Sequence, residues 1–349
     1  MHSTEKVQEA LKGVMDPELQ RNIVELGMVR DIQINGARVS LTLALTTLAC
    51  PLKDKIVDDA RQAVLALDGI DEVAIELAEM TDEERARISS EGQTYSGQAA
   101  HLNHIHHVIA VMSGKGGVGK SLVSGLLAVA LRRKGMQVGV LDADITGPSI
   151  PKMFFPNGAR PGATPAAILP AQSQSGVKIM SINLLLERED QAVIWRGPLI
   201  GGAIQQFWGD VLWGELDCLI VDLPPGTSDA SLTVMQSLPL NGVVLVTSPQ
   251  DLAGMVVRKA AQMAQQLNKP ILGLVENLSY FVCPDTGKRY DIFGPSHADE
   301  VALRLGVPFL GRLPIDSQIA ELCDQGKIED YASEVFATIV ERLVEKVFT

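Results

Sequence analysis

A glycine-rich segment with two lysines is the part of the sequence best suited to bind phosphate. It reads Gly114-Lys115-Gly116-Gly117-Val118-Gly119-Lys120-Ser121 and fits the P-loop pattern G-x-x-x-x-G-K-[ST]. Glycines let backbone N–H groups curl around phosphate oxygens, and the helix that follows adds partial positive charge at its N-terminus. In such loops the final lysine reaches the β- and γ-phosphates and the serine hydroxyl ligates Mg²⁺, the roles expected for Lys120 and Ser121. The segment therefore predicts a nucleoside triphosphate site.

Aspartates follow two of the apolar runs that read as buried strands. Asp142 and Asp144 come directly after Val138–Leu141, and Asp222 ends a second such run. Open α/β sheets place their ligands at the carboxyl ends of the strands, so we expect these side chains close to the phosphate loop. A carboxylate at the position of Asp222 can hold Mg²⁺ through water, and Gly226 would let its N–H approach the γ-phosphate. The alternative is that these aspartates only cap helices.

The elements that must position these residues read as a parallel sheet with helices between its strands. Short apolar runs alternate with longer helical segments, an arrangement typical of a doubly wound α/β fold. The runs are Val108–Met112, Val138–Leu141, Leu219–Val221, Val243–Val246 and Ile271–Val275. The phosphate loop follows the first run and precedes a helical segment, Leu122–Arg133. We therefore predict a P-loop domain with a doubly wound, mostly parallel sheet over residues 105–349.

A smaller α+β domain is predicted before it, over residues 1–80. Helical and strand-like spacing alternate there, over Val7–Val14, Met28–Ile34, Val39–Leu45, Asp54–Leu67 and Val73–Leu77. Asn35-Gly36 is a strong hairpin-turn signal between the first two of these strands. Residues 81–104 are rich in polar and small residues without sustained periodicity, and we interpret them as a linker.

Composition and charge exclude several classes of protein. The chain has 349 residues, with 30 Lys and Arg against 42 Asp and Glu, and a net charge of −12. Such a chain repels phosphate backbones and anionic lipid, so broad binding to nucleic acid or to a membrane is not expected. No apolar stretch approaches the length of a membrane span, no secretory signal is visible, and the 4 cysteines are too few for a disulfide scaffold. These features predict a cytoplasmic protein.

The second lysine of the phosphate loop, Lys115, gives it the form Lys-Gly-Gly-x-Gly-Lys-Ser. This form resembles the deviant P-loop of the ParA, MinD and nitrogenase-iron-protein class, in which the extra lysine reaches the nucleotide of a partner chain. The resemblance implies catalysis by a homodimer, with Lys115 and Lys120 on the phosphates. It also implies that Asp144 orients the attacking water and that Asp142 supports the metal. Asn277 matches the adenine-contacting asparagine of the class, which favours ATP over GTP.

Four further segments resemble the Mrp/ApbC family of iron–sulfur cluster carrier ATPases. They are Asp142–Ser149, Trp195–Pro198, Leu223–Asp229 and Ser248–Asp251. Residues 1–80 separately resemble a SufT/PaaD-like domain, which many bacterial members carry as an N-terminal fusion, through Asp16–Glu18, Asn22–Gly27 and Thr46–Pro51. The resemblance implies a homodimeric ATPase that uses ATP and Mg²⁺, binds an iron–sulfur cluster transiently and transfers it to apo iron–sulfur proteins alongside the cluster assembly machinery.

The cysteines depart from the pattern of this family. Its cluster ligands are a Cys-x-x-Cys near the end of the ATPase domain, so that a dimer completes the four thiolates of a [4Fe–4S] cluster. Here that place reads Cys283-Pro284-Asp285-Thr286, and a threonine hydroxyl is a poor substitute for a thiolate on iron. A dimer would offer two Cys283 thiolates, which leaves two positions for Cys50, an exogenous thiol, a partner protein or nothing. We expect Cys283 to be exposed and Cys50 to lie at a helix start, where the thiolate is favoured.

The remaining cysteines and two other features have simpler interpretations. Cys218 and Cys323 lie on apolar faces and are predicted in the core. Histidines crowd the end of the linker at His101, His104, His106 and His107. We interpret them as structural, with metal delivery as the alternative. The apolar stripe of 335–347 has an acidic polar face, so we expect it to pack on the sheet and not on a membrane.

Two rival functions stay open at this point. A ParA/MinD-like positioning switch would use the same ATPase fold but would need a basic stripe or basic terminal helix to bind DNA or membrane. An ATP-gated scaffold for cluster assembly would need no cluster of its own, and Thr286 in place of the second cysteine is the reason to consider it.

Overall fold

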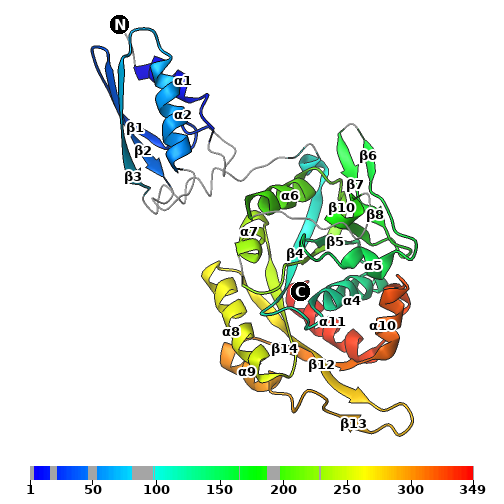
Figure 1. Ribbon diagram of the computed structural model, residues 1–349. Helices are drawn as coiled ribbons and strands as arrows, with labels where there is room; N and C mark the ends of the chain where they lie inside the picture. The colour runs from blue at the N-terminus through cyan, green and yellow to red at the C-terminus, as the bar shows by residue number, and fades with distance from the viewer. Residues whose placement is uncertain are drawn as a thin grey trace. The chain divides into compact units, whose positions relative to one another are not determined.

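Two separately packed units make up the chain, Met1–Tyr95 and Ser96–Thr349. The computed structural model describes residues 4–15, 22–45, 53–80, 97, 99–164, 166–186, 197–227 and 229–348 (Figure 1). The segments Asp16–Glu18 and Thr46–Pro51, with Cys50, lie outside the described residues, as does most of the predicted linker. Each unit has its own apolar core, so each is described by itself.

The first unit is the predicted small α+β fold. Its elements are α1 (Thr4–Leu11), β1 (Val29–Asn35), β2 (Arg38–Leu45), α2 (Lys53–Leu65) and β3 (Glu72–Glu79). β1 and β2 pair antiparallel across a two-residue turn, Gly36 and Ala37, one residue later than the predicted Asn35-Gly36. β2 and β3 run parallel because α2 carries the chain back between them. Apolar residues from all five elements fill one core, among them Leu11, Leu43 and Val64.

The second unit is built on one large sheet. Its strands are β4 (His104–Ser113), β5 (Val138–Asp142), β8 (Ala171–Gln172), β9 (Lys178–Ser181), β10 (Glu215–Asp222), β11 (Gly242–Thr247), β12 (Ile271–Val282), β13 (Arg289–Tyr290) and β14 (Phe309–Ile315). The order is β13-β12-β11-β4-β10-β5-β9-β8, with β14 also paired to β12. All neighbours run parallel except the edge strands β13 and β8, which confirms the predicted doubly wound, mostly parallel sheet.

Helices cover both faces of this sheet (Figure 1). One face packs against α6 (Gly197–Gly209), α7 (Asp229–Ser237), α8 (Asp251–Gln266) and α9 (Ala298–Leu305). The other packs against α4 (Lys120–Arg133), α5 (Ile150–Phe154), α10 (Ser317–Asp324) and α11 (Glu334–Val347). Alternate residues of β4 serve the two cores, with Ala110 on the first face and Val111 on the second, because successive side chains of a strand point to opposite faces. Short elements complete the unit: η1 (Ala100–Leu102), η2 (Ile182–Leu184), η3 (Ile328–Asp330) and the hairpin of β6 (Gly162–Thr164) and β7 (Ala167–Leu169).

Three details differ from or refine the sequence expectations. β4 begins at His104, before the apolar run, because Glu215–Cys218 of β10 extends the parallel pairing backward. Most of the histidine tract is therefore strand and not linker. The predicted packing of 335–347 on the sheet is confirmed, since α11 lies against α4 and β14. In the part of the chain that the structure describes, no helix is long and apolar enough to cross a membrane.

Candidate nucleotide-binding site

The glycine-rich loop lies between β4 and α4, at the carboxyl edge of the sheet. Gly119 has φ +79°, and a Cβ there would lie 2.1 Å from Asn277 Nδ2, so the position requires glycine. The Asn277 side chain, 2% exposed, donates from Nδ2 to the Val118 carbonyl at 2.9 Å. The predicted base-contacting residue on β12 is thus packed directly against the loop that the motif identified.

The lysine at the start of the loop is held within its own chain. Lys115 Nζ donates to Gln250 Oε1 at 2.5 Å, and Gln250 directly precedes α8. α8 also lies tightly on Gly114, where a Cβ would meet the Val256 carbonyl at 2.4 Å. Gly116 and Gly117, the next two residues of the loop after Lys115, are exposed. The loop is therefore bounded by α8 on one side and by Asn277 on the other.

Asp222 is the centre of a buried hydrogen-bonded cluster on the same edge. Its Oδ1 lies 2.6 Å from Lys120 Nζ and accepts a hydrogen bond from Ser124 Oγ at 2.6 Å. Its Oδ2 accepts one from Ser121 Oγ at 2.5 Å. Asp222 is fully buried and Lys120 only 6% exposed. Two successive turns of α4 thus satisfy one carboxylate, because positions 120, 121 and 124 share a helix face.

Asp142 is the register partner of Asp222 on the neighbouring strand, β5. It is fully buried, and its Oδ2 accepts hydrogen bonds from Ser181 Oγ at 3.1 Å and from the Ile150 N–H at 3.3 Å. Burial, and then the nearby Asp222 carboxylate, raise the pKa of Asp142 well above its ordinary value, while Lys120 opposes the shift.

The donor set of this edge suits Mg²⁺. Ser121, Asp142 and Asp222 contribute one hydroxyl and two carboxylates, all hard oxygen donors, and a dication would relieve the repulsion between the two acids. No cluster of three or more His, Cys, Asp or Glu that could bind a metal alone occurs among the described residues.

Asp144 and Gly226 are placed beside this cluster but make local contacts. Asp144 is 8% exposed, and its Oδ1 accepts from Thr146 Oγ1 and from the Gly147 N–H, both at 3.1 Å. The Gly226 N–H donates to the Ser113 carbonyl at 2.9 Å. In this structure that N–H is directed at the end of β4 and not at a phosphate position, so the role expected for it needs the Gly226 turn to shift.

Cys283 lies apart from these residues, in the turn between β12 and β13. It is six residues beyond Asn277 in the chain and directly follows Val282, the last residue of β12. The Thr286 hydroxyl and the backbone N–H groups of Thr286 and Asp285 hydrogen-bond to the sulfur and lower the pKa of the Cys283 thiol. Thr286, which stands where the resemblance places a second cysteine, therefore supports the first as a thiolate.

Cys218, Cys323 and the histidines of the described residues take no part in this site. Cys218 is fully buried, as predicted, and burial raises the pKa of its thiol. Cys323 is only half-buried, not fully in the core, because α10 places it at the edge of the apolar cluster; burial raises the pKa of its thiol to about 11. The His107 ring packs against Phe348, with ring centroids 4.6 Å apart, which is a structural contact.

Three residues of the site were not found from the sequence. Ser124 contacts Asp222, Gln250 contacts Lys115, and Ser181 contacts Asp142. For Ser124 a signal existed, since it lies one helical turn after Lys120 and must share its face. Gln250 and Ser181 belong to other strand ends, and only the order of strands in the sheet brings them to the loop.

Comparisons with known proteins agree with this geometry. The family model of NUBPL iron-transfer P-loop NTPases matches residues 104–348, and that of an iron–sulfur cluster assembly protein family matches residues 4–77. A relative from Synechocystis sp., named iron–sulfur cluster carrier protein, is 40% identical over 357 residues, which cover 99% of this chain and 98% of the relative.

Two solved structures are similar to this chain. A nucleotide-binding protein from Archaeoglobus fulgidus in complex with ADP has a TM-score of 0.60 at 46% identity, covering 66% of this chain and 91% of that one. The cell division ATPase MinD from Pyrococcus furiosus has a TM-score of 0.52 at 20% identity, covering 69% and 99%. The second likeness shows a common fold and nothing further.

Proposed function

Because the chain belongs to the family of NUBPL iron-transfer P-loop NTPases, we propose that it is an ATPase that carries an iron–sulfur cluster and transfers it to apoproteins. The observation that carries the ATPase half is the buried cluster of Lys120, Ser121 and Ser124 on Asp222, directly under the glycine-rich loop. The carriage half is supported by the name of the Synechocystis relative, iron–sulfur cluster carrier protein, and by the turn at Cys283, which favours the thiolate.

In the proposed reaction Lys120 and the loop N–H groups bind the β- and γ-phosphates, and Asn277 contacts the adenine. Ser121, Asp142 and Asp222 would hold Mg²⁺, which supplies charge neutralisation on the phosphates. Asp144 accepts a proton or hydrogen bond from the attacking water and orients it. Lys120 must leave Asp222 to reach a phosphate, so nucleotide binding exchanges one anionic partner of this ammonium for another.

We propose that two copies of the chain cooperate. Lys115, once released from Gln250, would stabilise negative charge on the nucleotide of the partner copy. ATP would then draw the copies together, and hydrolysis would loosen them and change how their cysteines are presented. This proposal is supported by the position of Lys115 at the exposed side of the loop, where a single side chain holds it.

The cluster is the cargo of this cycle. Two Cys283 thiolates, one from each copy, would hold it from opposite sides, and Cys50 or thiols of a client or an assembly protein would complete the ligand set. Thr286 adds no soft ligand, but its hydroxyl lowers the pKa of the Cys283 thiol and so favours the thiolate form. A cluster that the chain binds through only a few of its own residues is suited to release, which agrees with the function of a carrier.

Phosphate release by wild type and by Lys120→Ala, measured with ATP and with GTP, tests the ATPase half. We expect ATP hydrolysis by wild type that rises more than linearly with protein concentration, and none by the variant. Equal hydrolysis by both proteins would refute the assigned site. Retention of the ATP-bound chain on DNA or anionic liposomes would instead favour a positioning switch.

Anaerobic reconstitution with iron and sulfide tests the carriage half. Wild type, Cys283→Ser and Cys50→Ser are compared by iron and sulfide content, visible spectrum and transfer to an apo-ferredoxin. We expect wild type to hold a transferable cluster and Cys283→Ser to lose it. Wild type that hydrolyses ATP but takes up no iron would be a nucleotide-gated scaffold.

A further inference from the structure

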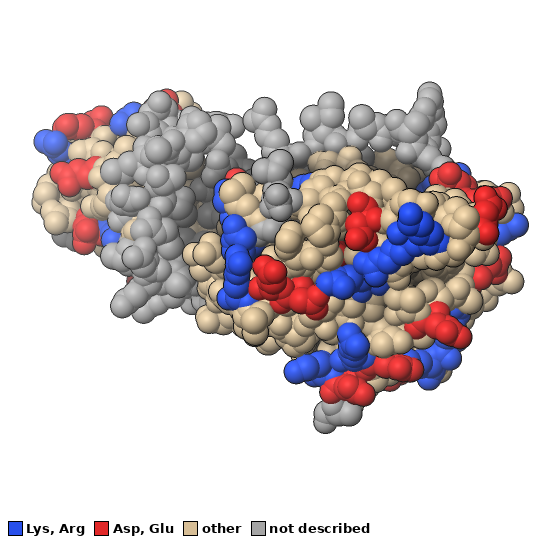
Figure 2. All heavy atoms as spheres, turned by 90° about the horizontal axis from the view of Figure 1, so that it is seen from below, with Lys and Arg blue, Asp and Glu red and all other residues tan. Residues whose placement is uncertain are grey.

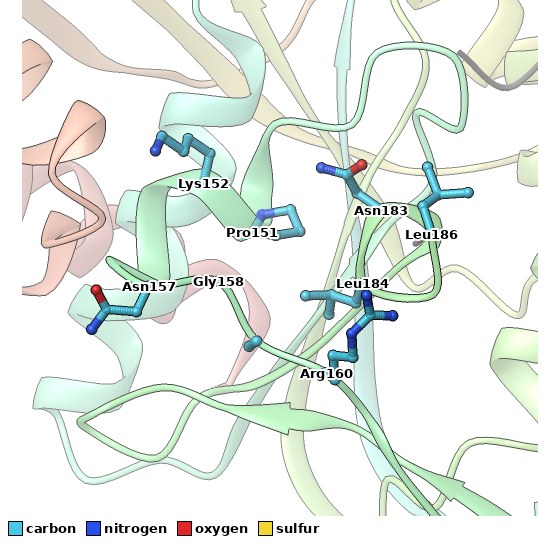
Figure 3. A pocket seen from close by; sticks show the side chains of 9 residues that line it. Pro151, Lys152, Asn157, Gly158, Arg160, Asn183, Leu184 and Leu186 are labelled. Carbon is cyan, nitrogen blue, oxygen red and sulfur yellow. The ribbon is translucent and has the colours of Figure 1, made fainter. Parts of the chain in front are cut away.

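A cavity of about 400 Å³ lies between α5 and η2, outside the nucleotide site. Its wall on one side comes from Pro151 and Lys152 of α5 and from Asn157 just beyond, and on the other from Asn183 and Leu184 of η2, with Arg160 nearby. Figure 3 shows Arg160 and Asn183 on the side of Leu184, with Pro151 between these residues and Lys152 and Asn157, whose exposed side chains extend away from Leu184. Its volume falls within the usual range of small-ligand sites.

The charge of this cavity is opposite to that of the chain. The described residues that line it include two cations, Lys152 and Arg160, two amides and, among them, no acid, whereas the chain as a whole carries −12. On the face seen in Figure 2, by contrast, acidic and basic side chains are interspersed. Arg160 has another interaction in the structure, but a guanidinium has five N–H donors and can serve two partners. Such a lining favours an anion small enough to enter, with carboxylate or phosphate oxygens.

Both walls of the cavity are hydrogen-bonded to the same buried carboxylate. Asp142 Oδ2 accepts from the N–H of Ile150, the residue before Pro151, and from the Ser181 hydroxyl. Ser181 in turn caps η2, since its Oγ accepts from the Asn183 N–H at 3.3 Å. A change in the partners of Asp142 therefore alters the anchoring of both walls at once, one through α5 and the other through η2.

We propose that the cavity between α5 and η2 binds a small organic anion with carboxylate or phosphate groups, and that this binding is linked to the nucleotide through Asp142. The linkage rests on the proposed function, because it needs Asp142 to take part in binding Mg²⁺ and nucleotide. The anion site itself does not. By thermodynamic reciprocity, an anion that changes the affinity for nucleotide must have its own affinity changed by the same factor. The cavity would thus report the level of a metabolite to the ATPase cycle.

Calorimetric titration of the full chain tests the anion site. Succinate is the carboxylate probe, used without nucleotide and with MgADP. Inorganic phosphate is the second probe, used only with MgADP present so that the α- and β-phosphate positions of the P-loop are filled; phosphate bound at the open γ-position would be unaffected by the cavity variant. We expect Lys152→Gln/Arg160→Gln to weaken binding about tenfold or more. The control Arg304→Gln/Lys346→Gln removes the same charge from α9 and α11, and should stay close to wild type. Equal binding by wild type and the cavity variant, or no binding of either probe, overturns the site. A preference for one probe identifies the kind of anion.

The same titrations test the linkage. We expect the succinate affinity to differ several-fold between nucleotide-free and MgADP-bound wild type. Ser181→Ala should remove this difference, and Ser181→Thr, which keeps the hydroxyl, should preserve it. Succinate binding that depends on Lys152 and Arg160 but is equal in both nucleotide states would refute the linkage. MgADP binding is measured in the same samples. If wild type does not bind MgADP, that result counts against the proposed function, and the titration without nucleotide still decides whether the anion site exists.

Discussion

Lys120 and Asp222 form a buried ion pair, with Nζ 2.6 Å from Oδ1. Lys120 is the P-loop lysine, whose ammonium would be needed to bind phosphate. Asp222 accepts hydrogen bonds from two serines of α4 as well, so three residues of the helix that follows the loop contact this strand-end carboxylate. Asp142 lies beside it, and among the ion pairs of the described residues none involves Asp142. Burial and the neighbouring Asp222 carboxylate raise the pKa of Asp142. Nucleotide and Mg²⁺ would together replace what Lys120 supplies here.

Removing the lysine should therefore affect folding as well as catalysis. Lys120→Ala leaves Asp222 buried without its counter-ion, and we expect the larger unit to lose about 3–5 kcal/mol of unfolding free energy. Lys120→Ala/Asp222→Asn removes both charges and should recover most of that loss while staying inactive. Urea denaturation followed by tryptophan fluorescence measures both. A single variant as stable as wild type would show that the pair is not formed in solution.

Ser124→Ala tests a residue that no motif includes. Its hydroxyl lies 2.6 Å from Asp222 Oδ1, inside the core, so its removal leaves one acceptor site of a buried carboxylate unsatisfied. We expect a loss of about 1–3 kcal/mol in unfolding free energy and a higher Mg²⁺ concentration for half-maximal ATP hydrolysis. Ser237→Ala, which removes a hydroxyl bonded only to the Thr233 carbonyl of α7, is the matched control. An unchanged magnesium requirement would argue against a positioning role for Ser124.

The fold was largely predictable because its signals are local. Apolar runs such as Val243–Val246 are buried on both faces, and a run of that kind between helices indicates a parallel strand without knowledge of its neighbours. Where a strand begins was less predictable. β4 extends back over polar histidines because β10 pairs with them, and that pairing lies more than a hundred residues away in sequence.

The site was predictable to the extent that it is encoded in one motif. Lys120 and Ser121 follow from the loop, and Asp142 and Asp222 from the rule that ligands gather at carboxyl ends of strands. The contact between Lys115 and Gln250 did not follow, because it depends on β11 lying next to β4 and on α8 packing over Gly114. The support that Thr286 gives to Cys283 was also missed, since sequence comparison treats that position as a lost ligand.

Thr286→Val should make Cys283 less reactive at neutral pH. The wild-type pKa of this thiol is lowered by hydrogen bonds from Thr286 and Asp285, so the thiolate persists to lower pH than in an ordinary cysteine. Without the hydroxyl the pKa rises, and the pH midpoint of alkylation by iodoacetamide should move upward. Thr286→Ser keeps the hydroxyl and should retain the wild-type profile. Peptide mass spectrometry resolves Cys283 from the other cysteines, and identical profiles for all three proteins would contradict the assigned hydrogen bond.

Changes at Gln250 should shift the concentration dependence of ATP hydrolysis in opposite directions. Lys115 must leave Gln250 before it can act on a partner copy, so Gln250→Ala removes a contact that competes with assembly. We expect its activity per chain to reach half-maximum at a protein concentration about tenfold or more below that of wild type, since a hydrogen bond to a charged group is worth about 1.5–3 kcal/mol. Gln250→Glu replaces a neutral acceptor by a carboxylate, holds Lys115 more strongly and should require a higher concentration. Activity that is independent of protein concentration in all three proteins would show that Lys115 acts within its own chain.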